Sequence, residues 1–190
     1  AGPCRDLSKS EREELSKHKI PATRIRVPNK TYAFEDKVYG QTSQNLAKSC
    51  GDFIVQRADE VFAYQLAVVV DDADMGVTEV VRGSDLLSST PRQLYLQDVL
   101  GLSHPIYAHL PILVAPDGRR LSKRNHDLDL GVLRAQGKTP EEILGFLAYC
   151  IGLAEKEEPL SAAQVANRFS WDVLRAHRKN VVVEHFSHVL

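Results

Sequence analysis

The chain has 190 residues, of which 43% are hydrophobic, and a formal net charge of −1. These values are ordinary for a globular protein of one domain or two small ones, and the charge excludes binding of nucleic acid through an overall positive field. A nucleic-acid partner would therefore need local basic patches. No apolar run reaches the length of a membrane span, and three widely spaced cysteines form no disulfide framework, so we expect a cytoplasmic protein without a membrane partner.

The sequence of the first fifty residues predicts short helices and strands. Ser8 and Glu11 have capping-box spacing, which predicts a short polar helix from Glu11 onward. Polar and apolar residues alternate in 23–27 and again in 32–34, a pattern typical of half-buried strands. Residues 40–49 are polar and predict a loop.

The middle of the chain alternates between strand and helix patterns. Residues 51–57 predict a strand, and residues 77–81 predict a strand of a parallel sheet. Residues 66–70 are ambiguous, because their β-branched run favours a strand by pattern alone. Thr90 and the proline after it predict a helix start, and Gly101 predicts its end.

The last part of the chain is predicted to be mostly helical after one more strand. Apolar residues 106–114 predict that strand. Thr139 and Glu142 form a second capping box. The predicted helices cover 130–136, 140–151, a segment that begins at Ser161 and a short one around Trp171, and residues 181–183 are expected to be extended.

The most informative stretch is the loop of residues 117–124. Pro116 and Gly118 turn the chain, and four of the next six residues are cationic. A cationic loop at the carboxyl end of a strand lies where open α/β sheets bind ligands. Lysine and arginine there suit a phosphate chain, although a solvated basic loop without a ligand has the same composition.

Read with three upstream segments, this loop resembles a known family. Residues 120–124, Arg-Leu-Ser-Lys-Arg, are similar to the Lys-Met-Ser-Lys-Ser loop of class I aminoacyl-tRNA synthetases, in the form of the glutamyl subgroup. Residues 63–72, 75–83 and 85–93 resemble the substrate-pocket segments of that subgroup in the same order. The resemblance covers 51–153 and implies an α/β fold, the second half of a Rossmann-type nucleotide-binding fold.

The resemblance divides the chain into three parts. They are residues 1–50, a remnant of an inserted acceptor-binding subdomain; 51–128, the C-terminal half of the catalytic domain; and 129–190, a helical stem-contact region. It also implies that 66–70 is a buried helix. The family's His-x-Gly-His motif is absent from the sequence. We therefore expect a C-terminal portion of a longer enzyme, inactive by itself and prone to self-association through an incomplete sheet.

The resemblance implies roles for five residues. Lys123 is the expected catalytic residue, because it would stabilise the charge that develops when the carboxylate of glutamate attacks the α-phosphorus of ATP. Arg120 and Ser122 would bind ATP together with Lys123, and Mg²⁺ would accompany the nucleotide. Arg82, at a strand end, would pair with the side-chain carboxylate of L-glutamate, which a planar guanidinium suits. Tyr64 would contact the same amino acid.

These assignments have structural alternatives. Arg82 could instead form a salt bridge with Asp85 or Asp52. His109 lies inside a predicted strand and is expected in the core rather than in catalysis. Residues 71–72 are two adjacent carboxylates, which point apart on a helix, so we assign no metal to them.

Cys4 resembles the last ligand of a zinc knuckle found in the family. The other ligands of that knuckle are absent from the sequence. One thiolate cannot hold structural zinc, which needs four ligands. We therefore predict no zinc in this chain, and zinc at Cys4 only in the full-length protein.

Two branches of the family fit the sequence. Full glutamyl-tRNA synthetases carry a long anticodon-binding region after the cationic loop, whereas only residues 125–190 follow it here. This length, the spelling of 125–131 and the serine at Ser84 favour the shorter glutamyl-Q tRNA(Asp) synthetases, which attach glutamate to queuosine in the tRNA.

The expected function is thus ATP-dependent activation of L-glutamate as the adenylate and its transfer to tRNA, with queuosine of tRNA(Asp) favoured. One alternative is a fragment of a glutamyl-tRNA synthetase that charges the tRNA 3′ end. A second is a non-catalytic tRNA-binding domain, which would bind tRNA in a salt-sensitive way without affinity for glutamate or ATP.

Overall fold

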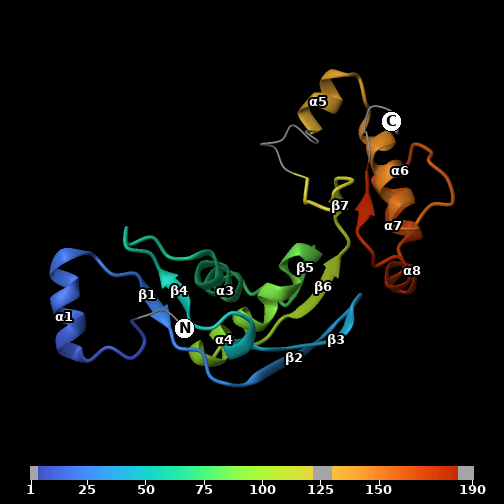
Figure 1. The fold of residues 1–190 in the computed structure, drawn as a ribbon. Coiled ribbons are helices and arrows are strands. Elements are labelled where there is room, and N and C mark those ends of the chain that lie inside the picture. The colour runs from blue at the N-terminus through green and yellow to red at the C-terminus, as the bar shows by residue number, and fades with distance from the viewer. Residues whose placement is uncertain (1–3, 122–129, 184–190) are drawn as a thin grey trace. The chain divides into compact units, whose positions relative to one another are not determined.

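The computed structural model describes residues 4–121 and 130–183, and the chain divides into two compact units (Figure 1). The first unit comprises residues 1–36, 41–80 and 86–107, and the second comprises 37–40, 81–85 and 108–190. The chain passes between the units inside three strands, β3 (Gly40–Asn45), β5 (Glu79–Gly83) and β6 (Ile106–Leu110). The predicted division into three parts stays a prediction, because these units are defined by packing alone.

The first unit contains most of the N-terminal elements. They are α1 (Lys9–His18), β1 (Thr23–Ile25), β2 (Thr31–Asp36), β3 (Gly40–Asn45), α2 (Leu46–Ser49), β4 (Phe53–Gln56), α3 (Tyr64–Asp74) and α4 (Thr90–Leu100). A 3₁₀ helix, η1 (Ser84–Ser89), leads into α4. The second unit adds β7 (Leu113–Val114), α5 (Leu130–Ala135), α6 (Pro140–Cys150), α7 (Ala162–Arg168), α8 (Trp171–Ala176) and β8 (Val181–Val182).

Three small sheets connect these elements. The largest has the strand order β3-β2-β6-β5, and its β2 and β6 are parallel, with Asp36 opposite Tyr107. β1 pairs with β4 in the antiparallel sense, and β7 pairs with β8 in parallel. The predicted α/β fold class is therefore confirmed at this level.

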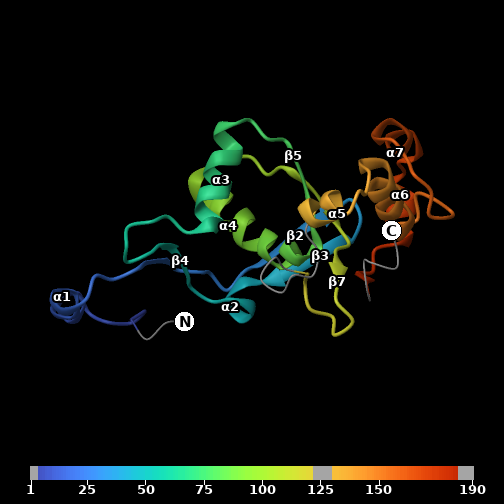
Figure 2. The same cartoon turned by 90° about the horizontal axis from the view of Figure 1, so that it is seen from above.

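The core of the first unit lies where α3 and α4 pack together and α4 packs on β2 (Figure 2). Leu46, Val69, Leu94 and Tyr107 are almost completely buried there. The ambiguous residues 66–70 form part of α3, as the family resemblance implied. Intrinsic β preference is a weak force in such a segment, because packing of the buried face outweighs it.

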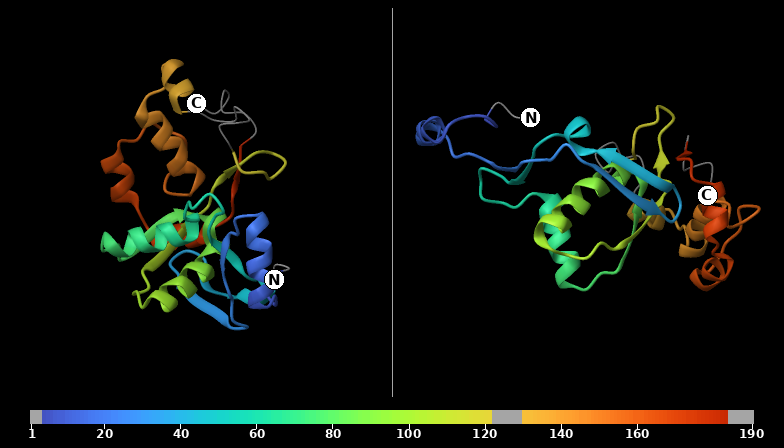
Figure 3. Two further views of the ribbon diagram at one scale, coloured as in Figure 1. Left: turned by 90° about the vertical axis from the view of Figure 1, so that its left-hand side faces the viewer. Right: turned by 90° about the horizontal axis from the view of Figure 1, so that it is seen from below.

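The N-terminal capping box is confirmed. The Ser8 hydroxyl accepts from Glu11 N, and the Glu11 carboxylate accepts from the Ser8 amide at 2.7 Å. Every residue of α1 is exposed, and Figure 3 shows this helix at the end of an extended segment. Local capping therefore holds α1, rather than burial of an apolar face.

Three local predictions were wrong. The single strand predicted over 106–114 is two strands, β6 and β7, which belong to different sheets. Residues 40–49 were expected to be a loop but form β3 and α2, because β3 is an edge strand next to β2 and Asn45 caps α2 by accepting from Lys48 N at 3.1 Å. Thr90 was expected to cap α4, but Ser89 occupies that position and Thr90 is a fully buried helical residue. The prediction missed η1, which delivers the chain directly into the helix.

Local signals predicted the helices of the second unit well. Thr139 with Glu142, and Ser161 with Gln164, form complete capping boxes at the starts of α6 and α7. Within this unit the backbone of Glu158 crosses α6 at Gly145, and Leu160 N donates to Glu141 O at 2.9 Å. Among the described residues, no helix is long and apolar enough to span a membrane.

Candidate active site

Arg82 lies near the end of β5, and a buried histidine orients its side chain. Arg82 Nε donates a hydrogen bond to His109 Nε2 at 3.0 Å. His109 is on β6 and has no exposed surface. Because a guanidinium always carries its protons, Nε2 of the histidine is the acceptor and the ring proton is on Nδ1. His109 is thus a core residue, as expected, but one that also orients the predicted glutamate-binding arginine.

Asp85 and Asp52, the carboxylates considered as alternative partners of Arg82, each form an ion pair with a different arginine. Asp85 Oδ2 lies 2.5 Å from Arg120 Nη1, and Asp52 Oδ1 lies 2.7 Å from Arg5 Nη1. Asp52 also accepts from Val27 N at 2.8 Å, which ties β4 to the chain after β1.

Gly83 allows the close approach that the Asp85 ion pair needs. A Cβ at this position would lie 2.6 Å from Asp85 Oδ1 and 2.9 Å from Ile112 Cγ2. Real Cβ atoms do not make such contacts, so a larger residue would push the Asp85 carboxylate away from its present position.

The cationic loop begins as a tight hairpin. Gly118 N donates to Ala115 O at 2.8 Å, Ala115 N donates to Arg119 O at 2.9 Å, and Val114 pairs with Arg120 in an antiparallel bridge. Gly118 has φ +80°, a conformation that glycine adopts without strain, and this three-residue loop with a left-handed residue is a common hairpin. The predicted turn is confirmed.

Asn180, just before β8, links this strand to Ser84 at the start of η1 and to Ile112 before β7. Its Oδ1 accepts from Ser84 Oγ at 3.1 Å and from Ile112 N at 3.2 Å, beside the β8 bond from Val181 N to Ile112 O. The sequence gave no signal for this contact, since nearly a hundred residues separate Ser84 from Asn180. For His109, by contrast, a signal existed, because a buried histidine must find a hydrogen-bond partner.

The other predicted site residues do not all lie in the same unit as Arg82. Tyr64 is the first residue of α3 in the first unit and is 55% exposed, whereas Arg82 and Arg120 belong to the second unit. Arg120 is well exposed, and its contact with ATP stays a prediction. Ser122 and Lys123 lie outside the described residues.

The described residues offer no evident metal site. Across 4–121 and 130–183, no group of three His, Cys, Asp or Glu side chains could hold a metal ion. Cys4 is exposed. The predictions about zinc and about Mg²⁺ with ATP remain predictions.

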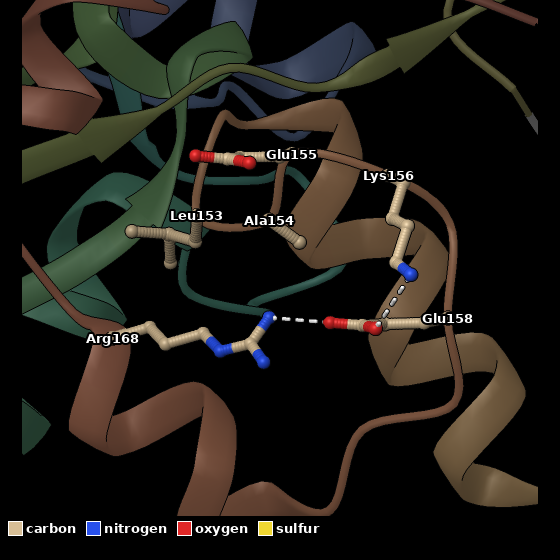
Figure 4. Close-up of a pocket in the computed structure, with 6 residues that line it drawn as sticks. All are labelled: Leu153, Ala154, Glu155, Lys156, Glu158 and Arg168. Atoms are coloured by element: carbon tan, nitrogen blue, oxygen red, sulfur yellow. Dashed lines mark hydrogen bonds and ion pairs between the residues drawn. The ribbon is translucent and has the colours of Figure 1, made fainter.

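A hollow lies in the helical part of the second unit (Figure 4). It has a volume of about 500 Å³ and is open to solvent. Its charged side chains pair with one another, since Arg168 Nη1 contacts Glu158 Oε1 at 3.0 Å and Lys156 Nζ contacts Glu158 Oε2 at 3.8 Å. These pairs brace the 153–158 segment, and we assign the hollow no ligand.

Comparison with known proteins gives the class of protein to which the chain belongs. Residues 1–187 match the family model of "tRNA synthetases class I (E and Q), catalytic domain". The chain belongs to this family.

Individual relatives narrow the comparison to one branch. The chain is 45% identical over 182 residues to the glutamyl-Q tRNA(Asp) synthetase of Symbiobacterium thermophilum, which covers 95% of this chain and 55% of that protein. It is 53% identical over 122 residues to the protein of that description from Pseudomonas aeruginosa, covering 64% of this chain and 39% of that one. The chain thus spans about half the length of the curated relatives it matches.

A solved structure supports the fold. The crystal structure of a glutamate tRNA ligase from Elizabethkingia meningosepticum in complex with its amino acid matches with a TM-score of 0.72 and 24% identity, over 93% of this chain and 39% of that one. This likeness confirms an α/β fold similar to the catalytic domain of that enzyme. The predicted absence of the first half of the nucleotide fold stays a prediction.

Proposed function

We propose that this chain is part of a glutamyl-Q tRNA(Asp) synthetase, which activates L-glutamate with ATP and transfers it to queuosine of tRNA(Asp). The observation that carries the proposal is the arginine at the end of β5, oriented by a buried histidine, in the unit that also presents the cationic hairpin. In this proposal the chain supplies the second half of the nucleotide fold.

Arg82 binds the side-chain carboxylate of glutamate. A guanidinium recognises a planar carboxylate through parallel N–H donors, which selects an acidic amino acid over a neutral one. The bond from Arg82 Nε to His109 holds the guanidinium plane in place before the substrate arrives. This pre-orientation lowers the conformational entropy lost on binding.

The cationic loop holds the phosphates of ATP. ATP supplies the activated phosphorus that the α-carboxylate of glutamate attacks, with pyrophosphate leaving. Lys123 stabilises the charge that develops on the phosphate oxygens, and Ser122 donates a hydrogen bond to them. Arg119, on the hairpin before these residues, adds a partly exposed cation that suits a polyanion.

The test of this proposal is glutamate-dependent exchange of pyrophosphate into ATP, without tRNA, by the full-length protein that contains this chain, because the chain by itself is expected to be inactive. Arg82→Ala is expected to raise KM for glutamate by about 10- to 100-fold, the loss of charge-assisted hydrogen bonds. Lys123→Ala is expected to lower kcat by about 10²- to 10³-fold. Arg134→Ala, which removes an exposed cation of the last turn of α5, is the matched control and should change neither constant.

Transfer to tRNA separates the candidate activities. The glutamyl-Q assignment predicts that glutamate becomes attached to tRNA(Asp) containing queuosine and not to tRNA(Asp) lacking it. Charging of tRNA(Glu) at its 3′ end would instead place the protein with the full glutamyl enzymes. Salt-sensitive tRNA binding without any exchange, with or without tRNA, would refute the catalytic proposal in favour of a binding domain.

A further inference from the structure

The first cation of the loop sequence Arg-Leu-Ser-Lys-Arg forms an ion pair with a carboxylate. Arg120 Nη1 and Asp85 Oδ2 are 2.5 Å apart, with 71% of the arginine side chain and 21% of the aspartate side chain exposed. Asp85 is the second residue of η1 and lies three residues after Arg82. The ion pair therefore joins the hairpin of the cationic loop to the strand end that carries the glutamate-binding arginine.

The surroundings support a fixed position for this pair. Gly83 leaves room for Asp85 Oδ1, because a Cβ there would lie within 2.6 Å of it. On the other side, the bridge between Val114 and Arg120 fixes the arginine's backbone to β7. Both ends of the pair thus start from hydrogen-bonded backbone, which reduces the entropy lost when the side chains meet.

The pair also has an electrostatic consequence. A lone carboxylate three residues from Arg82 would compete with glutamate for cations and repel the phosphates of ATP. Arg120 neutralises Asp85 at short range, so the charge of the loop available for phosphate comes from the other cations.

We propose that Asp85 is a positioning residue, which anchors Arg120 and thereby holds the hairpin of residues 115–120 next to the strand end that carries Arg82. In this role Arg120 acts mainly as the loop anchor rather than as a ligand of ATP. The kinetic consequence rests on the proposed synthetase function, whereas the anchor itself does not.

The anchor is tested by amide hydrogen exchange of the unliganded protein. Asp85→Asn and Arg120→Gln are each expected to speed exchange at the hairpin amides of Ala115 and Gly118 by about two- to fivefold, the effect of losing a partly exposed ion pair. The double variant should exchange no faster than the faster single variant. Unchanged exchange in both single variants would overturn the proposal, whatever the activity of the protein.

Kinetics then separate the anchor from direct phosphate binding. Pyrophosphate exchange in Asp85→Asn and Arg120→Gln is expected to show a kcat lowered by about five- to tenfold, with the double variant no worse than the poorer single one. If Arg120 binds ATP directly, Arg120→Gln would raise KM for ATP equally in both backgrounds, and the proposal would be wrong.

A matched control uses an ion pair of the same residue types elsewhere in the unit. Asp172→Asn breaks the contact between Arg175 Nη1 and Asp172 Oδ1 on α8, which are 2.7 Å apart. It should leave hairpin exchange and kcat unchanged. Absence of pyrophosphate exchange by the full-length protein would refute the proposed function alone, because the hydrogen-exchange experiment would still decide whether Asp85 anchors the hairpin.

Discussion

Gly145→Ala provides a sharp test of how the second unit packs, because two physical effects oppose each other there. In the interior of a helix this substitution usually stabilises by about 1 kcal/mol. In α6, however, the new Cβ would lie 1.8 Å from Glu158 O and 2.8 Å from Glu158 C. Both neighbouring atoms are backbone, so the crossing segment would have to move by about 1.5 Å to restore ordinary contact distances.

That movement would disturb a well-buried neighbour. Leu160 is 2% exposed, and its amide donates to Glu141 O at 2.9 Å. Losing this hydrogen bond costs about 1 kcal/mol, and overpacking costs about 1–3 kcal/mol. After subtraction of the helix-propensity gain, we expect a net destabilisation of about 2 kcal/mol.

Urea unfolding followed by tryptophan fluorescence measures this effect. Trp171 is the single tryptophan of the chain and belongs to α8 of the same unit, so its signal reports on this unit. Leu147→Ala, at an exposed position two residues further along α6, is the control and should change stability by less than about 1 kcal/mol. A Gly145→Ala variant as stable as the original protein, or more stable, would refute the close crossing of Glu158.

Two further predictions concern a cap and the cysteines. Thr139→Ala removes the cap of α6 and should destabilise the protein by about 1 kcal/mol in thermal unfolding. Hydrogen bonds from Thr139 lower the pKa of Glu142 below its ordinary 4.5, so the stability difference between the original protein and the variant should shrink as the pH falls below that value. A stability difference that does not change with pH would contradict the reciprocal hydrogen bonds. Burial is the main cause and the charge of Glu157 the second cause that raises the pKa of Cys150 from 9.0 to about 11. A thiol reagent at pH 8 should therefore label the exposed Cys4 first and Cys150 slowly, and the rate at Cys150 should rise steeply above pH 9. Because the folded pKa is raised, this thiol also makes the protein less stable as the pH rises from 9 towards 11, and equal labelling rates at pH 8 would count against its burial.

Features set by near neighbours in the chain were predictable from the sequence. The capping boxes at Ser8, Thr139 and Ser161 formed as expected, because each satisfies backbone donors of its own first turn. The same holds for the left-handed glycines at Gly101 and Gly118, which end α4 and turn the hairpin. The family resemblance, carried by the spelling of short segments, also indicated that 66–70 is helical where pattern alone favoured a strand.

Only the tertiary structure decided which distant groups meet. Residues 40–49 look like a loop by composition, yet 40–45 form the strand β3, because β2 lies beside it and supplies hydrogen-bond partners, and 46–49 form the short helix α2. The bond from Arg82 to His109 and the ion pair from Arg120 to Asp85 join residues 27 and 35 positions apart. The roles of the site residues stay predictions that the family resemblance implies. The partners that orient the cations could not be predicted, because contacts between distant side chains depend on how the strands pack rather than on sequence proximity.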